Sequence, residues 1–246
     1  MAAAAAPLTP AFADPAGTGL VISEVFLNGG SSGASYLNKF VELYNPTASA
    51  VSLTGDTLQY RAAASTVVPG GAQVFALSGT VAAHGHFLIQ LPGNGASSNP
   101  GEALPTPDLS TGNSVNPGAA GGTLYVAAST TGVLPTDTTV VDKLGWGASN
   151  SPEGTAATGN SLVLSYQRAT TGADTNNNAA DFAAATPTPQ NSGGGTASVA
   201  VTNPGTQNAT AGTAIAPLTL AATGGTTPYA WTGTGMRACL ALSPAG

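Results

Sequence analysis

LVISEVFLNGGSSGASYLNKFVELYN, residues 20–45, is the stretch of sequence that decides the fold. It holds two runs rich in β-branched and aromatic residues, separated by a Gly/Ser loop, and this pattern predicts two strands. Each run carries one glutamate, Glu24 or Glu42, in otherwise apolar surroundings. Because a buried carboxylate needs hydrogen-bonding or charged partners, these two residues are the first candidates for a structural or functional site.

Similar short runs recur further along the chain, separated by turn residues. The predicted strands span residues 20–27, 40–45, 57–61, 73–77, 86–91, 123–127, 139–144 and 161–167. Gly (33 residues) and Pro (18 residues) interrupt the chain too often for long helices, so we expect an all-β fold. Apolar residues make up 42% of the chain, which is enough for a core and argues against disorder. Residues 92–122, rich in Gly, Pro, Asn and Ser, are expected to form a long excursion.

The order of several motifs resembles that of lamin-tail domains. The motifs are Pro46-Thr47, Leu53-Thr54-Gly55, residues 86–91, Val141-Asp142, residues 161–168 and the sequence TPTPQN at residues 186–191. The resemblance implies an immunoglobulin-like β-sandwich. Asp56 departs from it, since relatives commonly have an aromatic residue after the Leu-Ser/Thr-Gly turn.

Changes in composition predict four segments. Residues 1–13 end in Ala11-Phe12-Ala13, a small-x-small pattern that indicates the remnant of a secretion signal; an Ala/Pro leader is the alternative. Residues 14–190 form the lamin-tail-like sandwich, and residues 191–197 form a Gly-rich linker. Residues 198–246 resemble the beginning of the immunoglobulin-type repeats of bacterial surface and secreted proteins.

The second module is expected to be incomplete. In the repeat family a segment like GLPAGLSLSPSTG follows, whereas residues 236–246 of this chain read MRACLALSPAG. A sandwich without its last strands exposes apolar faces and unpaired edges, so we expect the module to be marginal alone. The sequence therefore reads as a fragment of a larger multidomain protein.

Charge limits the classes of partner. The chain has five basic and eleven acidic residues and a net charge of -6, the wrong footprint for direct binding of nucleic acid. The single cysteine, Cys239, cannot form an internal disulfide, and no Cys/His spacing indicates a zinc site. No apolar run is long enough to span a membrane.

Glu24, Glu42 and Arg168 are predicted to be structural. A carboxylate pair for glycosidase chemistry is the competing interpretation. We expect instead that the glutamates bind loop backbone or pair with Arg168, since buried charges require such partners.

Three further features are candidates for binding. Trp146 lies between two glycines, which could leave its ring uncovered for a ligand; a place in the core is the alternative, as for the other aromatic residues in or beside strands. Asp174, Asn176 and Asn178 alternate as oxygen ligands do in calcium loops, although the central Gly and closing Glu of an EF-hand are missing; a polar loop with Asx turns is the alternative. His84 and His86 could hold a metal from one face of a strand, but a turn is the preferred interpretation.

The predicted function is that of a non-catalytic extracellular binding or adhesion module of a secreted bacterial protein. No G-x-S-x-G elbow and no phosphate-binding loop occurs, so the sequence does not indicate an enzyme. The expected partner is a surface ligand, either carbohydrate or protein, and no cofactor apart from calcium is considered. The alternative is an accessory N-terminal portion of a secreted nuclease or phosphoesterase, because bacterial domains of this resemblance often accompany such enzymes.

Overall fold

The computed structural model describes residues 9–10, 19–169 and 172–193, and beyond these only residues 200–201, 205, 210, 218–220 and 222–223. The chain divides into two compact units, Met1–Gly194 and Gly195–Gly246. In the second unit, β14 (Ala200–Val201) pairs antiparallel with β15 (Ala222–Thr223). Most of the predicted signal remnant and of the predicted repeat lies outside the described residues.

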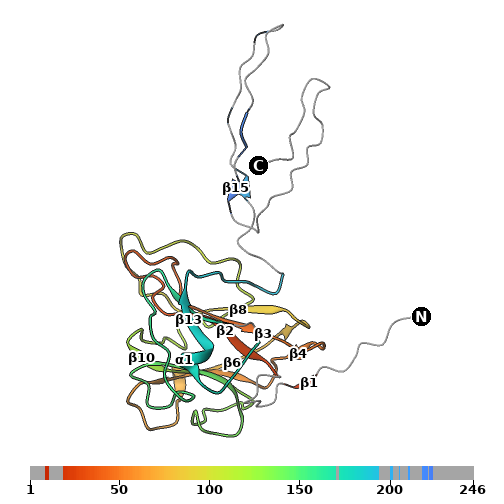
Figure 1. The fold of residues 1–246 in the computed structure, drawn as a ribbon, viewed down its shortest axis with the longest axis vertical. Coiled ribbons are helices and arrows are strands. Elements are labelled where there is room, and N and C mark those ends of the chain that lie inside the picture. Colours follow the sequence, from red (N-terminus) through yellow and green to blue (C-terminus); the bar gives the residue numbers. More distant parts are fainter. Residues whose placement is uncertain are drawn as a thin grey trace, which may run out of the picture. The chain divides into compact units, whose positions relative to one another are not determined.

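The first unit is built from two main sheets, and strands of the six-stranded sheet lie above those of the four-stranded sheet in Figure 1. In sheet order, the six-stranded sheet contains β13 (Phe182–Ala185), β12 (Ser165–Arg168), β2 (Val21–Phe26), β3 (Phe40–Tyr44), β8 (His86–Gln90) and β9 (Leu109–Ser110). The four-stranded sheet contains β11 (Val140–Gly147), β10 (Gly121–Ala127), β5 (Thr57–Ala62) and β6 (Val74–Ala76).

Smaller elements complete the unit. A third sheet consists of β1 (Thr9–Pro10), β4 (Val51–Ser52) and β7 (Thr80–Val81). The described helices are short: η1 (Gly71–Gln73) precedes β6, and α1 (Asn178–Asp181) precedes β13. Among the described residues, no helix is both long and apolar enough to cross a lipid bilayer. The fold is therefore the predicted all-β, immunoglobulin-like sandwich.

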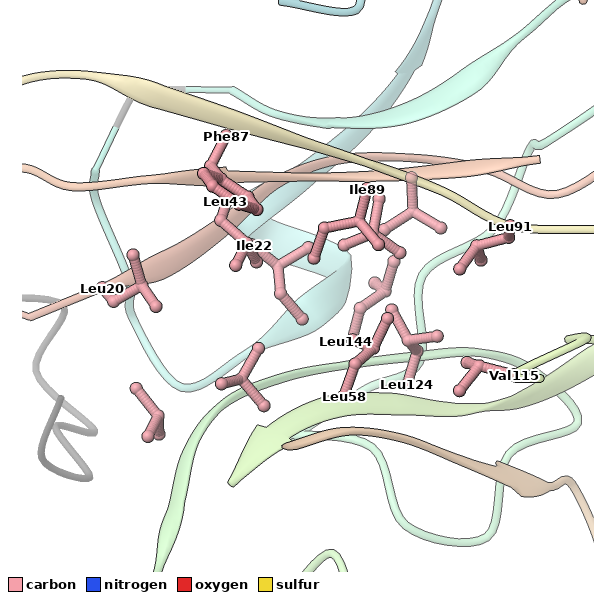
Figure 2. Packing of buried hydrophobic residues seen from close by; sticks show 14 of the residues in the cluster. Leu20, Ile22, Leu43, Leu58, Phe87, Ile89, Leu91, Val115, Leu124 and Leu144 are labelled. Carbon is pink, nitrogen blue, oxygen red and sulfur yellow. The ribbon is translucent and has the colours of Figure 1, made fainter. Parts of the chain in front are cut away.

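The main core lies between the two large sheets. Figure 2 shows side chains from β2, β3 and β8 pointing toward side chains from β5, β10 and β11. Alternation along β3 explains this arrangement, because Val41 and Leu43 face the core while Phe40 and Glu42 face the other way. A register shift in β2 between Ile22 and Glu24 keeps the core face continuous, so that Val25 also points inward.

The outer face of the six-stranded sheet is also buried. Phe26, Phe40 and Leu88 form a second apolar cluster there, and Tyr36 packs against it from the loop between β2 and β3. The two carboxylates at residues 24 and 42 lie on this same face. They are therefore covered by loops instead of solvent, and these loops supply their hydrogen-bond partners.

The long excursion predicted at residues 92–122 contains a strand. β9 pairs parallel with β8 at the edge of the six-stranded sheet, and Asp108 accepts a hydrogen bond from the Leu88 backbone N–H (2.7 Å). The excursion thus covers a sheet edge that would otherwise have unpaired backbone groups. Short strands such as β4, β7, β9 and β13 were not predicted, because two to four residues are too few for a period-two pattern to appear.

Candidate functional site

Glu24 and Glu42 lie directly opposite each other on β2 and β3, and their residues are 3% and 2% exposed. Glu42 accepts hydrogen bonds from Ser23 Oγ (2.6 Å) and from the Gln190 backbone N–H (2.6 Å), and its Oε1 lies 2.8 Å from His86 Nδ1. Two carboxylates thus face each other at the centre of a sheet, where each needs donors from outside the strands.

Glu24 obtains its donors from two segments. Its carboxylate accepts hydrogen bonds from Ser165 Oγ (2.6 Å) and from the Thr188 backbone N–H (3.1 and 3.2 Å to its two oxygens). Residues 186–191, here called the C-terminal strap, are therefore bound at two backbone positions by the two glutamates. Of the partners expected from the sequence, loop backbone is the one present.

Burial changes the acidity of Glu24. It raises the pKa of Glu24 to about 7, with a further contribution from the Glu42 charge, although hydrogen bonds from Ser165 and Thr188 act in the opposite direction. A carboxyl group with this pKa could serve as a general acid at neutral pH. Here, however, Ser165 and the strap already donate hydrogen bonds to its oxygens. The geometry therefore fits a structural role in which Glu24 and Glu42 fasten the strap to the sheet, an arrangement here called the clasp.

Arg168 does not pair with either glutamate, which corrects the second of the two alternatives expected from the sequence. Gln167 is the register partner of Glu24, and successive residues of a strand point to opposite faces, so Arg168 points away from Glu24. Its Nη2 donates to Asp142 Oδ2 (2.7 Å), and both side chains are 1% exposed. Its Nε donates to the Ile22 carbonyl (2.9 Å), and the guanidinium lies 4.6 Å from the centre of the Phe182 ring.

Asp142 belongs to a cluster of carboxylates. One oxygen from each of Asp142, Glu153 and Asp174 lies within 4.8 Å of the others, and this is the group of possible metal ligands found among the described residues. The three residues come from β11 and from two loops that are distant in sequence. Asp181 is close as well, since Arg168 Nη1 lies 3.8 Å from its Oδ2 and 3.7 Å from Asp174 Oδ1.

Burial also dominates the acidity of the cluster. It raises the pKa of Asp142 to about 6, with Arg168 lowering it, and the pKa of Glu153 to about 8, with the charges of Asp142 and Asp174 adding to the effect. The pKa of Asp174 is raised as well, again mainly by burial. Ionising the carboxyl groups of the cluster therefore costs free energy, and binding of protons or of a cation would lower this cost.

The three residues predicted to bind calcium have different roles in the structure. Asp174 is in the cluster, whereas the Asn178 side chain ties two segments together: its Oδ1 accepts from the backbone N–H groups of Gly145 (2.8 Å) and Glu153 (2.9 Å). Asn176 has a positive φ of 57°, and its N–H donates to Asp174 Oδ1 (2.9 Å), which is an Asx turn. Asn178 thus positions Glu153, which the sequence did not single out, and its own oxygen is already occupied.

Trp146 is a core residue, which corrects the expectation of an uncovered ring. Its exposure is 0%, it stacks on Tyr60 with ring centres 6.1 Å apart, and its Nε1 donates to the Gly118 carbonyl (3.2 Å). The flanking glycines do not expose the ring. A side chain at Gly145 would collide with Pro152 and one at Gly147 with Ala120, so both glycines are required by close backbone approach, and the Trp146 ring itself points with Leu144 into the main core.

The His84-Gly85-His86 segment forms a turn into β8. His84 adopts a positive φ of 53°, and His86 packs against Tyr44 in addition to its contact with Glu42. The arrangement is the turn preferred from the sequence. Asp142 could have been found from the sequence by the signal that identified the two glutamates, since it lies in the apolar run VVDKLGW; Glu153, in a polar loop, carries no such signal.

Two of the cavities formed by the described residues bear on the candidate sites. The larger, about 540 Å³, is lined by Glu153, Lys143, Asn176 and the 135–141 region, so it opens beside the carboxylate cluster. The smaller, about 440 Å³, is lined by Tyr36, Glu102 and the first residues of the C-terminal strap. Neither cavity contains Glu24 or Glu42.

Comparison with known proteins gives one family. The model of the Lamin Tail Domain family matches residues 13–178, which cover β2 to β12 and the carboxylate cluster. No curated protein matches the chain.

Proposed function

The chain belongs to the lamin tail domain family, and on that premise we propose that it is a non-catalytic binding module that holds a secreted protein at an extracellular surface. The family fold is an immunoglobulin-like sandwich, an architecture that is generally non-catalytic and of a binding type. The extracellular location is supported by the sequence pattern before Asp14.

One observation carries the non-catalytic part of the proposal. Glu24 and Glu42, the carboxylate pair that could have served an enzyme, are 3% and 2% exposed and bind the backbone of the strap at Thr188 and Gln190. A substrate would have to displace the strap to reach them. Their geometry therefore supports a structural role.

Loops carry the features that favour binding. Large apolar side chains are exposed in two pairs of neighbouring residues, Val67 and Val68 (70% and 50%) and Leu162 and Val163 (41% and 52%). Exposed apolar side chains on loops of a rigid sandwich are suited to contact with a protein or with the apolar faces of sugars. We expect the surface ligand to be a protein or a carbohydrate.

Nucleic acid is not expected to be a direct ligand. With five basic residues and a net charge of -6, few phosphates can be neutralised, and the release of counterions that drives non-specific binding is nearly absent. The proposal thus predicts no dissociation constant below about 10⁻⁶ M for short duplex or single-stranded DNA in a fluorescence-anisotropy titration.

Binding is tested with the full chain immobilised on beads. Insoluble polysaccharides and extracellular matrix proteins are applied in parallel, and retention is compared between the parent and two double variants, Val67→Ser/Val68→Ser and Leu162→Ser/Val163→Ser. Loss of retention in one double variant, with an unchanged melting temperature, supports the proposal and locates the surface. Hydrolysis of a phosphodiester or glycoside substrate that disappears in Glu24→Gln without a change in melting temperature would contradict it.

The resemblance to bacterial lamin-tail domains supports a second candidate, the accessory portion of a secreted nuclease or phosphoesterase, because such domains often accompany these enzymes. In that case the module would position a catalytic domain on its substrate instead of attaching the protein to an extracellular surface. Mixing the full chain with a separately expressed secreted phosphoesterase and measuring a gain in turnover on surface-bound substrate distinguishes this role from simple adhesion.

A further inference from the structure

The carboxylate cluster joins a strand and two separate loops. Asp142 lies on β11, Glu153 lies in the loop after it, and Asp174 lies in the loop before α1. The Asn178 side chain holds these loops in place through the Glu153 and Gly145 backbone N–H groups, and its Nδ2 also donates to Glu153 Oε2 (3.2 Å). The positions of the three carboxylates are thus set by the fold.

Asp174 provides an independent sign of a missing partner. Its side chain is only 1% exposed, and among the described residues no donor reaches its Oδ2. Its Oδ1, by contrast, accepts from the Asn176 N–H. A buried carboxylate oxygen without a donor costs free energy, and next to other carboxylates it requires either a proton or a cation.

The balance of charge favours a cation. When all four carboxyl groups of Asp142, Asp174, Asp181 and Glu153 are ionised, the positive charges of Arg168 and Lys143 leave two negative charges uncompensated. Arg168 already donates to Asp142, to Ile22 and to Ala173, and Lys143 Nζ donates to the Pro135 carbonyl (3.1 Å). A divalent ion would neutralise the remaining charge.

We propose that Asp142, Glu153 and Asp174 form a calcium site that fastens the two loops to β11. Calcium binds six to eight oxygen ligands at about 2.3–2.6 Å, and the three oxygens, which lie within 4.8 Å of one another, are close enough to share one ion. Magnesium usually keeps several waters and is bound by one or two carboxylates, so a set of three protein carboxylates favours calcium. Water or backbone carbonyls would complete the shell.

The larger cavity gives the ion a route. Glu153 lines this cavity and also belongs to the cluster, so it connects solvent with the buried oxygens of Asp142 and Asp174. Asp137 lines the same cavity but is fully exposed, and its Oδ1 accepts from the Thr139 N–H (3.0 Å) and Oγ1 (2.7 Å). Asp137 is thus a matched control: an acidic residue of the same cavity that is outside the cluster.

The test uses the full chain after treatment with a chelator. Calorimetric titration with CaCl₂ should show one site, with a dissociation constant in the range of about 10⁻⁴–10⁻³ M that is typical of extracellular modules. The melting temperature should rise with calcium and rise less with the same concentration of magnesium. Absence of both heat and a melting shift at about 10 mM calcium, well above that range, would overturn the proposal.

Variants locate the site. Asp174→Asn and Glu153→Gln should each weaken calcium binding by at least about tenfold, the loss of one charged ligand, whereas Asp137→Asn should bind like the parent. Without calcium, Asp174→Asn should melt no lower than the parent, because it replaces the buried carboxylate oxygen that accepts no hydrogen bond and keeps the oxygen that accepts from the Asn176 N–H. Calcium binding that is equal in all three variants and the parent would place the ion elsewhere and refute the assignment.

Discussion

Arg168→Ala is expected to destabilise the first unit strongly. The substitution removes the charge that compensates Asp142 at 2.7 Å, where both side chains are 1% exposed, and it removes donors from the Ile22 and Ala173 carbonyls. Breaking a buried ion pair by removing one partner costs about 3–5 kcal/mol, because the remaining charge stays buried without compensation. With a urea m-value of about 2 kcal/mol/M, the midpoint should fall by about 1.5–2.5 M.

The measurement is urea unfolding followed by tryptophan fluorescence in a Trp231→Phe background. The signal then comes from Trp146, which is 0% exposed in the core of the first unit. Arg61→Ala is the matched control: Arg61 is also buried (7% exposed), but it donates to Asn150 and to Ser151, which carry no charge. The control should lose only about 1–2 kcal/mol.

A double variant separates charge from packing. Asp142→Asn should restore part of the stability lost in Arg168→Ala, because the uncompensated carboxylate is then neutral. A midpoint for Arg168→Ala within the range of the Arg61→Ala control, or no recovery in the double variant, would refute the view that Arg168 acts by compensating Asp142.

Three further outcomes are expected. Glu42→Ala should lower the free energy of unfolding by about 1–3 kcal/mol and speed hydrogen exchange at the Gln190 amide, since that N–H loses its acceptor at 2.6 Å; unchanged exchange would contradict the clasp. In a chelator, the free energy of unfolding should fall as the pH rises from about 5 to about 8. The reason is that the pKa of Glu24 is raised to about 7, so the native state binds more protons than the unfolded state in this pH range, and each pKa unit corresponds to about 1.4 kcal/mol. Glu24→Gln should make the stability less dependent on pH. A free energy of unfolding of the parent that rises with pH over this range would show the sign to be wrong. Limited proteolysis should cut first between residues 191 and 196, near the division of the two units, and a first cut within residues 40–45 would contradict this domain boundary.

The sequence by itself determined the class of fold and the identity of the clasp glutamates. Period-two runs such as residues 40–44 identify strands because alternate side chains must enter the core, and this requirement is local. The same local rule marks Glu24 and Glu42 as unusual, since carboxylates interrupt apolar strands. Buried charges need hydrogen-bond donors, and from this general rule we expected loop backbone to bind at least one of the two glutamates.

Only the tertiary structure decided which residues meet. Arg168 was one of the two partners expected for the glutamates, but the pairing of Gln167 with Glu24 turns Arg168 to the other face, toward Asp142. Trp146 was a candidate for ligand contact as well as for the core, and the alternation of β11 places its ring in the core between the sheets. The carboxylate cluster depends on contacts between a strand and two loops, and neither composition nor spacing encodes those contacts, because the energy that fixes them comes from packing and hydrogen bonds between segments far apart in the chain.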